Sequence, residues 1–205
     1  MENGQGHQKI MTYDCKIIDQ KYHLKGLINQ NVCNELIKFY EDHKHMTVPE
    51  ESYKFKEDKR IEDNCSFLNI SHLRSNSSFQ KPYEVILKYL RIVLTNYEIY
   101  VRNHLCDNYR NIFMTHTDNI RIIKYEVGQH IKDHTDASIA IRGSLTVNLN
   151  DDYEGGEFRF FGGREKINLS AGEAMLFPAE PIWIHGTEPI TKGARYAINC
   201  FLKQS

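Results

Sequence analysis

Two copies of the tripeptide His-Thr-Asp carry the most informative chemistry in this sequence. They are His116-Thr117-Asp118 and His134-Thr135-Asp136. In an extended segment, residues i and i+2 project from the same face, so an imidazole and a carboxylate at this spacing can bind one metal ion from adjacent directions. The chain has ten histidines among 205 residues, and a lone His-x-Asp is more often an ordinary surface turn. The neighbouring sequence must therefore decide what each copy does.

The second copy has the surroundings that a metal site requires. His134-Thr135-Asp136 follows a strand-like run from Ile120 to Val127, and His185 lies within the predicted apolar strand that begins Pro181-Ile182-Trp183-Ile184. Two histidines and one carboxylate occupy one face of an octahedron and leave three positions open, as non-haem Fe(II) oxygenases require. The first copy follows an irregular stretch and is assigned to solvent or a turn. His116 nevertheless remains a rival for the ligand role.

Arg195 stands ten residues after His185, in the apolar run GARYAINCFL. An arginine in the middle of an apolar strand is costly unless its charge meets an anion. The planar guanidinium suits two-point contact with a carboxylate. That carboxylate could belong to an acidic residue of the chain or to a bound small molecule. Because Arg195 follows a possible metal-binding histidine, the bound molecule is favoured.

The N-terminal half is predicted to be helical. A first helix is expected from Asn31 to His45, with Asn31 as its N-cap, and a second from Pro82 to about His104. The second helix carries a continuous apolar stripe made of Ile86, Tyr89, Leu90, Val93, Leu94, Tyr97 and Val101. The polar segment 46–81 between the helices is either a surface loop or a candidate lid over a substrate. Residues 1–13 are expected to form a flexible tail.

From Asn119 onward the pattern changes to short β-branched and aromatic runs separated by turn residues. The runs are NIRIIKYEV, SIAIRGSLTVNLN, GEFRFF, KINLS, AMLFP, PIWIHG and RYAINCFL. Six or seven short strands in fewer than 90 residues indicate an antiparallel sandwich or a small barrel. We therefore expect a helical region over 14–118 that buttresses a β-core over 119–205.

Composition narrows the class of protein. The formal net charge of −1 gives no electrostatic case for binding nucleic acid or an anionic membrane surface. No apolar run approaches the length of a membrane span, and the polar N-terminus lacks the apolar core of a signal peptide. Five cysteines at irregular spacings, without a CxxC pair, suit a reducing compartment. We therefore expect a cytoplasmic protein; its oligomeric state is left open.

Four ordered motifs resemble those of the Fe(II)/2-oxoglutarate-dependent dioxygenases, most closely the prolyl 4-hydroxylase branch. The motifs are YEVG(x)5HTD, YEGGEFRF, AGEAMLFP and IHGTEPITKGARYAI, and they fall within about residues 120–202. The resemblance implies an α+β fold whose core is a double-stranded β-helix, or jelly roll, with N-terminal buttressing helices. It also implies Fe(II), 2-oxoglutarate and O2 as cofactor and cosubstrates, with ascorbate as a candidate reductant.

The resemblance also implies a role for individual residues. His134, Asp136 and His185 match the iron ligands, and Arg195 matches the residue that binds the distal carboxylate of 2-oxoglutarate. Tyr125 matches a tyrosine whose hydroxyl assists there.

A strand is predicted over 144–148, and alternate side chains of that strand share one face. Ser144 matches a position near the cosubstrate that is often threonine, and Thr146 lies on the same face. For both residues, a hydroxyl that merely fills the strand remains an alternative.

The implied activity is hydroxylation of an unactivated C–H bond with release of succinate and CO2. A prolyl residue of a peptide or protein is the leading substrate. Three positions differ from collagen-type prolyl hydroxylases: Ile131 replaces an aromatic residue, Phe201 replaces a tryptophan, and Arg195 replaces a lysine. The alternatives are a hydroxylase of a free amino acid or other small molecule, and a non-catalytic β-sandwich binding module. A nucleic-acid demethylase and a zinc hydrolase fit the residues less well.

Overall fold

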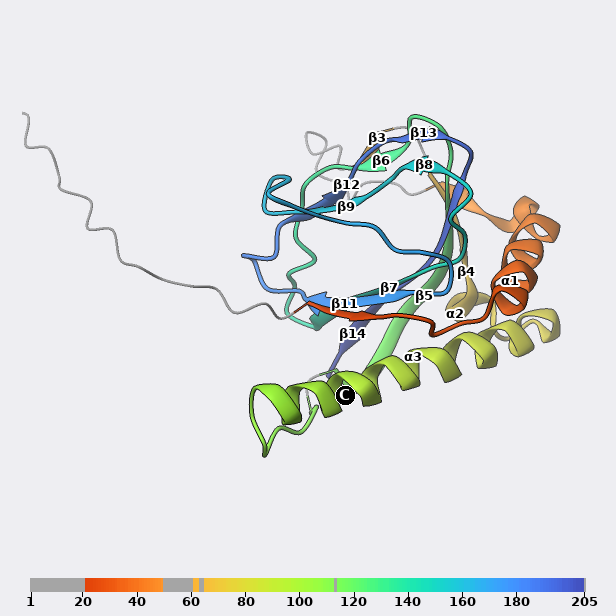
Figure 1. Cartoon of the computed structure of the whole chain (residues 1–205). Helices are drawn as coiled ribbons and strands as arrows, with labels where there is room; N and C mark the ends of the chain where they lie inside the picture. The colour runs from red at the N-terminus through yellow and green to blue at the C-terminus, as the bar shows by residue number, and fades with distance from the viewer. Residues whose placement is uncertain (1–20, 50–60, 63–64, 113, 205) are drawn as a thin grey trace, which may run out of the picture.

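The structure is a computed structural model that describes residues 21–49, 61–62, 65–112 and 114–204. Its centre is a seven-stranded sheet in which neighbouring strands are antiparallel. In spatial order the strands are β1 (Tyr22–Leu24), β11 (Ala174–Pro178), β7 (Ile141–Asn148), β14 (Arg195–Lys203), β5 (His116–Tyr125), β4 (Ser66–Asn69) and β2 (Val48–Pro49). Helix α3 (Ser77–His104) lies along one face of this sheet (Figure 1).

Three small sheets lie on the opposite side of the large sheet (Figure 1). They consist of β10 (Glu165–Ile167), β9 (Phe158–Phe160) and β12 (His185–Thr187); of β13 (Ile190–Lys192) and β8 (Glu154–Gly155); and of β3 (Ile61–Glu62) and β6 (His130–Ile131). The sheets enclose a second apolar cluster around Phe160, Phe177 and Trp183. The predicted antiparallel β-sandwich is therefore confirmed, with two layers of strands facing one another.

The large sheet has one face that looks toward the small sheets and one that packs on the helices. Leu145, Val147 and Ile198 belong to the main apolar core together with the buried stripe of α3. Because side chains alternate along a strand, Ser144, Thr146 and Asn148 lie on the other face of β7. This inner face is where the polar residues of the site gather.

Helix α1 (Gln30–Asp42) begins one residue before the predicted start, and the predicted cap is wrong. The side chain of Asn29, and not of Asn31, accepts a hydrogen bond from the backbone N–H of Val32 at 3.0 Å. Both asparagines are chemically suitable caps, and the apolar spacing defines the helix start only to within a turn. A short 3-10 helix, Lys44–Met46, follows α1.

Helix α3 begins five residues before Pro82, so the predicted first-turn proline lies inside the helix. Asn76 caps it by accepting a hydrogen bond from the backbone N–H of Ser78 at 3.2 Å. Most of the predicted stripe is buried, and the helix end at His104 agrees with the prediction. The buried side chains of α3 are Phe79, Ile86, Leu90, Val93, Tyr97 and Val101.

The N-terminal region also contributes strands that the sequence pattern did not predict. β1 pairs with β11 at one edge of the large sheet, and β4 pairs with β5 toward the other. The segment 46–81, expected as a loop or lid, therefore contains β2, β4 and a one-turn helix α2 (Ile70–Leu73), as well as the start of α3. Its residues 50–60 and 63–64 lie outside the described residues, as does the expected tail 1–13. Among the described helices, none combines the length and apolar character needed to cross a bilayer.

Candidate active site

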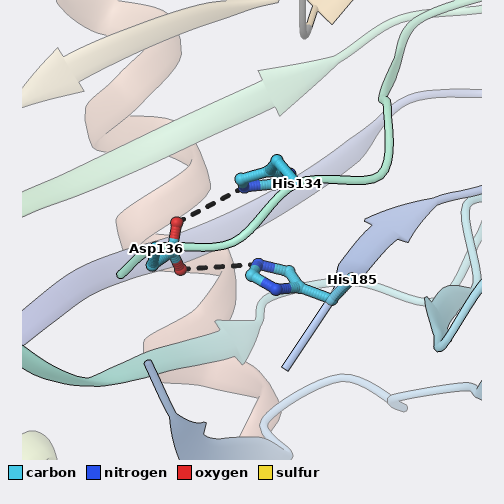
Figure 2. A group of neighbouring side chains, drawn as sticks. All are labelled: His134, Asp136 and His185. Carbon is cyan, nitrogen blue, oxygen red and sulfur yellow. Dashed lines mark ion pairs between the residues drawn. The ribbon is translucent and has the colours of Figure 1, made fainter. Parts of the chain in front are cut away.

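His134, Asp136 and His185 come together on the inner side of the sandwich, as predicted for a metal site. One ligand atom from each lies within 4.8 Å of the others. Figure 2 shows the Asp136 carboxylate to one side of the two imidazoles, with one oxygen toward each ring. His134 Nε2 lies 3.3 Å from Oδ1, and His185 Nε2 lies 3.4 Å from Oδ2. Two imidazole nitrogens and one carboxylate oxygen converging in this way are a donor set for Fe(II) or another divalent metal.

The backbone holds the two histidines directly beside each other. His134 and His185 form an isolated antiparallel bridge in which each backbone N–H donates to the carbonyl of the other at 2.9 Å. His185 is the first residue of β12. The predicted strand beginning at Pro181 is therefore wrong for the residues before His185. Those preceding residues form a turn in which Trp183 N–H donates to the carbonyl of Glu180 at 2.9 Å.

Both imidazoles are oriented by the same local contact. His134 Nδ1 lies 2.8 Å from the carbonyl oxygen of Lys132, and His185 Nδ1 lies 3.0 Å from that of Trp183, two residues earlier in each case. With the proton on Nδ1, the ring donates to the carbonyl, and the lone pair of Nε2 is directed toward Asp136. Both rings therefore present the nitrogen that a metal would bind.

Asp136 is held in its ionised form by its neighbours. Burial alone would raise the pKa of this carboxyl, but the imidazoles of His134 and His185 hold the pKa well below its ordinary value. Ser144 Oγ donates a short hydrogen bond to Oδ2 of the same carboxylate. The hydroxyl that the sequence analysis placed near the cosubstrate therefore contacts the carboxylate of the metal-binding group.

Arg195 is the first residue of β14, not a mid-strand residue as expected, and its side chain is almost fully buried at 2% exposure. Nε donates to Asn148 Oδ1 at 2.9 Å, and Nη1 donates to the carbonyl of Gly156 at 3.1 Å. The guanidinium carbon lies 4.7 Å from the centre of the Phe158 ring. Within the described residues, no carboxylate forms an ion pair with Arg195. The interpretation of Arg195 as one half of a structural ion pair is therefore not supported.

The other predicted residues of the site occupy the same inner face. Tyr125 is buried opposite Arg195 in the β5–β14 register, with its ring centre 5.6 Å from the guanidinium carbon. Thr146 Oγ1 donates to Asn199 Oδ1 at 2.8 Å across the β7–β14 pair. The structure thus brings Tyr125 to the arginine and joins Thr146 to a neighbouring strand.

The first His-Thr-Asp copy lies away from this group. His116 is exposed at the start of β5, so it faces solvent, which is one of the two predicted alternatives, and lies at a strand end and not in a turn. Asp118 pairs with Lys203 at 2.6 Å. Neither side chain belongs to the group of ligand atoms formed by the second copy.

The residues present fit both groups that the resemblance implies. The His-Asp-His donor set fits a divalent iron, because its lone pairs are already directed to one point. The buried guanidinium of Arg195 fits the distal carboxylate of 2-oxoglutarate, since a buried cation without an acidic partner among the described residues is costly until an anion joins it.

Comparison with known proteins agrees with this geometry. Residues 120–203 match the family described as the 2OG-Fe(II) oxygenase superfamily. The segment that carries the site residues is therefore similar to this superfamily. A PKHD-type hydroxylase from a Synechococcus species is 33% identical over an alignment of 91 residues, which covers 38% of this chain and 40% of that protein. The chain thus spans well under half the length of this curated relative.

Solved structures share the fold over most of the chain. A prolyl hydroxylase of Trichoplax adhaerens, in complex with a hypoxia inducible factor oxygen degradation domain peptide fragment, has a TM-score of 0.65 at 15% identity and covers 90% of this chain and 84% of its own. A Pseudomonas putida prolyl-4-hydroxylase has a TM-score of 0.63 at 12% identity and covers 91% and 93%. The predicted α+β fold with a jelly-roll core is confirmed by this likeness.

The sequence analysis gives no role to two asparagines near Arg195. Asn148, the last residue of β7, contacts its side chain, and Asn150 contacts the backbone of Ala194 and Tyr196. Their signal in the sequence is weak, because asparagine is common in turns. Only the structure shows that both side chains are buried.

Proposed function

We propose that this 2OG-Fe(II) oxygenase domain hydroxylates an unactivated C–H bond, and that its substrate is a prolyl residue of a peptide or protein. The observation that carries the activity is the pairing of two features on one inner face of the sandwich. One is the convergent His134, Asp136 and His185 group, and the other is the buried Arg195 without an acidic partner among the described residues.

Each residue would perform a definite task in this reaction. His134, Asp136 and His185 would hold Fe(II) on one face, and Arg195 would bind the distal carboxylate of 2-oxoglutarate. When bound, Fe(II) and 2-oxoglutarate activate O2, so that one oxygen atom enters the substrate C–H bond and the other enters succinate, with loss of CO2. The apolar side chains of Phe160 and Phe177, which lie against His185, would exclude water from the metal.

The prolyl substrate is supported by the likeness to prolyl hydroxylases of known structure and to the PKHD-type hydroxylase. The Trichoplax adhaerens protein carries a bound peptide fragment, which makes a peptide the first substrate class to test. A free amino acid or another small molecule is the alternative, since the iron and cosubstrate chemistry would be the same.

The activity is tested by titrating 2-oxoglutarate into anaerobic Fe(II)-loaded protein. We expect a weak visible metal-to-ligand charge-transfer band that is absent in His185→Ala and in Arg195→Ala. His116→Ala is the matched control and should keep the band, because His116 lies outside the ligand group. Folded, iron-loaded protein without the band would refute the oxygenase proposal, and loss of iron in His116→Ala but not in His134→Ala would refute the ligand assignment.

The substrate is tested by measuring 2-oxoglutarate consumption with and without each candidate substrate. Proline-containing peptides should increase succinate formation and gain the mass of one oxygen atom, while the same peptides with alanine in place of proline should not. Free proline and other amino acids form the second arm. Turnover with these small molecules alone would replace the peptide proposal with the small-molecule alternative.

A further inference from the structure

Two asparagines spaced two residues apart hold Arg195 in different ways: Asn148 bonds its side chain, and Asn150 bonds the backbone of the residues on either side of it. We propose that they are positioning residues for the carboxylate-binding arginine, so that the cosubstrate site is set before any ligand arrives. The inference rests on the proposed function, because it assigns to Arg195 the carboxylate of a 2-oxo acid. It concerns residues that the motifs of the sequence do not include.

Asn148 fixes the side chain of Arg195. Its own side chain is completely buried, and its Oδ1 accepts the 2.9 Å hydrogen bond from Arg195 Nε. Its Nδ2 lies 2.8 Å from the carbonyl of Leu169, 2.6 Å from that of Asn150 and 3.1 Å from the hydroxyl of Tyr153. Because these acceptors fix the amide nitrogen, the amide cannot turn over, and Oδ1 must face Arg195.

Asn150 fixes the backbone on either side of the same arginine. Its Oδ1 accepts a hydrogen bond from Tyr196 N–H at 2.7 Å, and its Nδ2 donates to the carbonyl of Ala194 at 2.7 Å. Nδ2 also lies 2.6 Å from Asp152 Oδ1. The side chain therefore takes the place of a strand partner where β7 has ended, and it anchors the first residue of β14.

These contacts leave one end of the guanidinium to a ligand. Nε and Nη1 are bonded to Asn148 and Gly156, while Nη2 makes no hydrogen bond with the described residues. Gly156 packs beside the stem of the arginine: an added Cβ would clash with Ile190 Cδ1 at 2.5 Å and lie in ordinary contact, at 3.5 Å, with Arg195 Cδ. An arginine held in this way loses less conformational freedom when it binds a carboxylate, which raises affinity without a new ligand contact.

The experiment measures binding of two 2-oxo acids to protein loaded with redox-inactive Mn(II). 2-Oxoglutarate has the distal carboxylate, and 2-oxopentanoate has a methyl group in its place. In Asn148→Ala, we expect the Kd for 2-oxoglutarate to rise by about tenfold or more, as for loss of an oriented hydrogen bond to a charged group. The Kd values for 2-oxopentanoate and for Mn(II) should stay unchanged, which general damage to the fold would not allow.

Asn76→Ala is the matched control, because it removes a hydrogen-bonded asparagine that caps α3 and whose contacts include neither Arg195 nor the two asparagines. It should lower stability and leave both 2-oxo acid affinities unchanged. Asn150→Ala provides a second variant in case Asn148→Ala does not fold, and it should show the same selective loss. An unchanged 2-oxoglutarate affinity in a folded variant, or an equal loss for both acids, would overturn the inference. Failure of the parent protein to bind 2-oxoglutarate would instead overturn the proposed function itself.

Discussion

The two ends of the inner face are built on different electrostatic principles. At the metal-binding end, the Asp136 carboxylate lies beside two imidazoles and accepts a hydrogen bond from Ser144, so an anion faces the point where a metal cation would bind. At the other end, Arg195 is more deeply buried, and its partners among the described residues are neutral, namely an amide oxygen, a backbone carbonyl and aromatic rings. One end therefore offers an anion to a cation, and the other offers a cation to an anion.

The two ends also differ in what holds them. The metal-binding end is assembled from a loop and the start of a short strand, joined by a single backbone bridge between His134 and His185. Arg195 begins a nine-residue strand in the middle of the large sheet. We therefore expect changes at the metal-binding end to abolish metal affinity, and changes at the arginine end to act on cosubstrate affinity while the metal stays bound.

The largest effect is expected from Asp136→Ala. Removing the carboxylate takes away one ligand of three and leaves two imidazoles without their shared anion, so iron binding should fall below detection. Equilibrium dialysis against Fe(II) under anaerobic conditions measures this directly. If the variant kept iron at the parental affinity, Asp136 would not be the anion on which metal binding depends.

Arg195→Met should separate the two ends most clearly. The variant keeps much of the buried apolar volume but removes the cation, so 2-oxoglutarate affinity should fall by about 100-fold, as for truncation of one partner of a buried charge pair. Iron affinity should stay within about twofold of the parent, since no metal ligand is touched. Calorimetric titration of the Mn(II) protein with 2-oxoglutarate measures the first quantity, and a parallel loss of metal would contradict the independence of the two ends.

Ser144→Ala tests how far the metal-binding end depends on its supporting contact. The hydroxyl donates to the Asp136 carboxylate, and loss of a contact that orients a metal ligand typically costs 10- to 100-fold in metal affinity. We expect a fall of about tenfold in Fe(II) affinity with little change in 2-oxoglutarate affinity at saturating metal. If cosubstrate affinity fell instead, Ser144 would be the cosubstrate contact that the sequence analysis proposed.

The smallest effect is expected from a change at Glu41, which lies on the outer face of the large sheet. Glu41 of α1 accepts hydrogen bonds from Tyr196 at 2.5 Å and Lys124 at 3.0 Å, and these partners hold the pKa of its carboxyl below the ordinary value of 4.5. Its contribution to stability is therefore present above pH 4.5 and is lost as the pH falls through the lower, folded pKa. Since the Glu41 side chain is 36% exposed, the contribution should be below about 1 kcal/mol.

Glu41→Gln should flatten the acid side of the stability profile without changing iron or 2-oxoglutarate affinity. Urea unfolding midpoints measured between about pH 3 and pH 7 test this expectation. A change in either ligand affinity would mean that the outer face communicates with the site.

Sequence and structure agree more closely on which residues gather at the candidate site than on the surrounding topology, for a physical reason. His134, Asp136 and His185 are unusual residue types in a restrictive spacing, and metal coordination tolerates few alternatives. The helix stripe was also predictable, because burial of one face imposes a period of 3.6 residues. The first residues of the helices were not predictable. Asn29 and Asn31 are equally suitable caps for α1, and Pro82, which lies inside α3, is also acceptable in a first turn.

The hydrogen-bond network around Arg195 could not have been predicted. Asn148 contacts an arginine 47 residues away in the sequence, and no local pattern encodes such a pair. The strands β1 and β4 are four residues or shorter, too short to show an alternating pattern. Long-range pairing decides these features, and one sequence does not contain it.

The N-terminal strands have a consequence for dissecting this protein. The segment that matches the oxygenase superfamily, 120–203, holds only the central strands of the large sheet, while β1 and β4 with β2 close its two sides. A fragment cut at residue 119 would expose unpaired backbone groups along β11 and β5, which are templates for intermolecular strand addition. Such a fragment would retain every proposed ligand of the metal and the cosubstrate, yet it should aggregate.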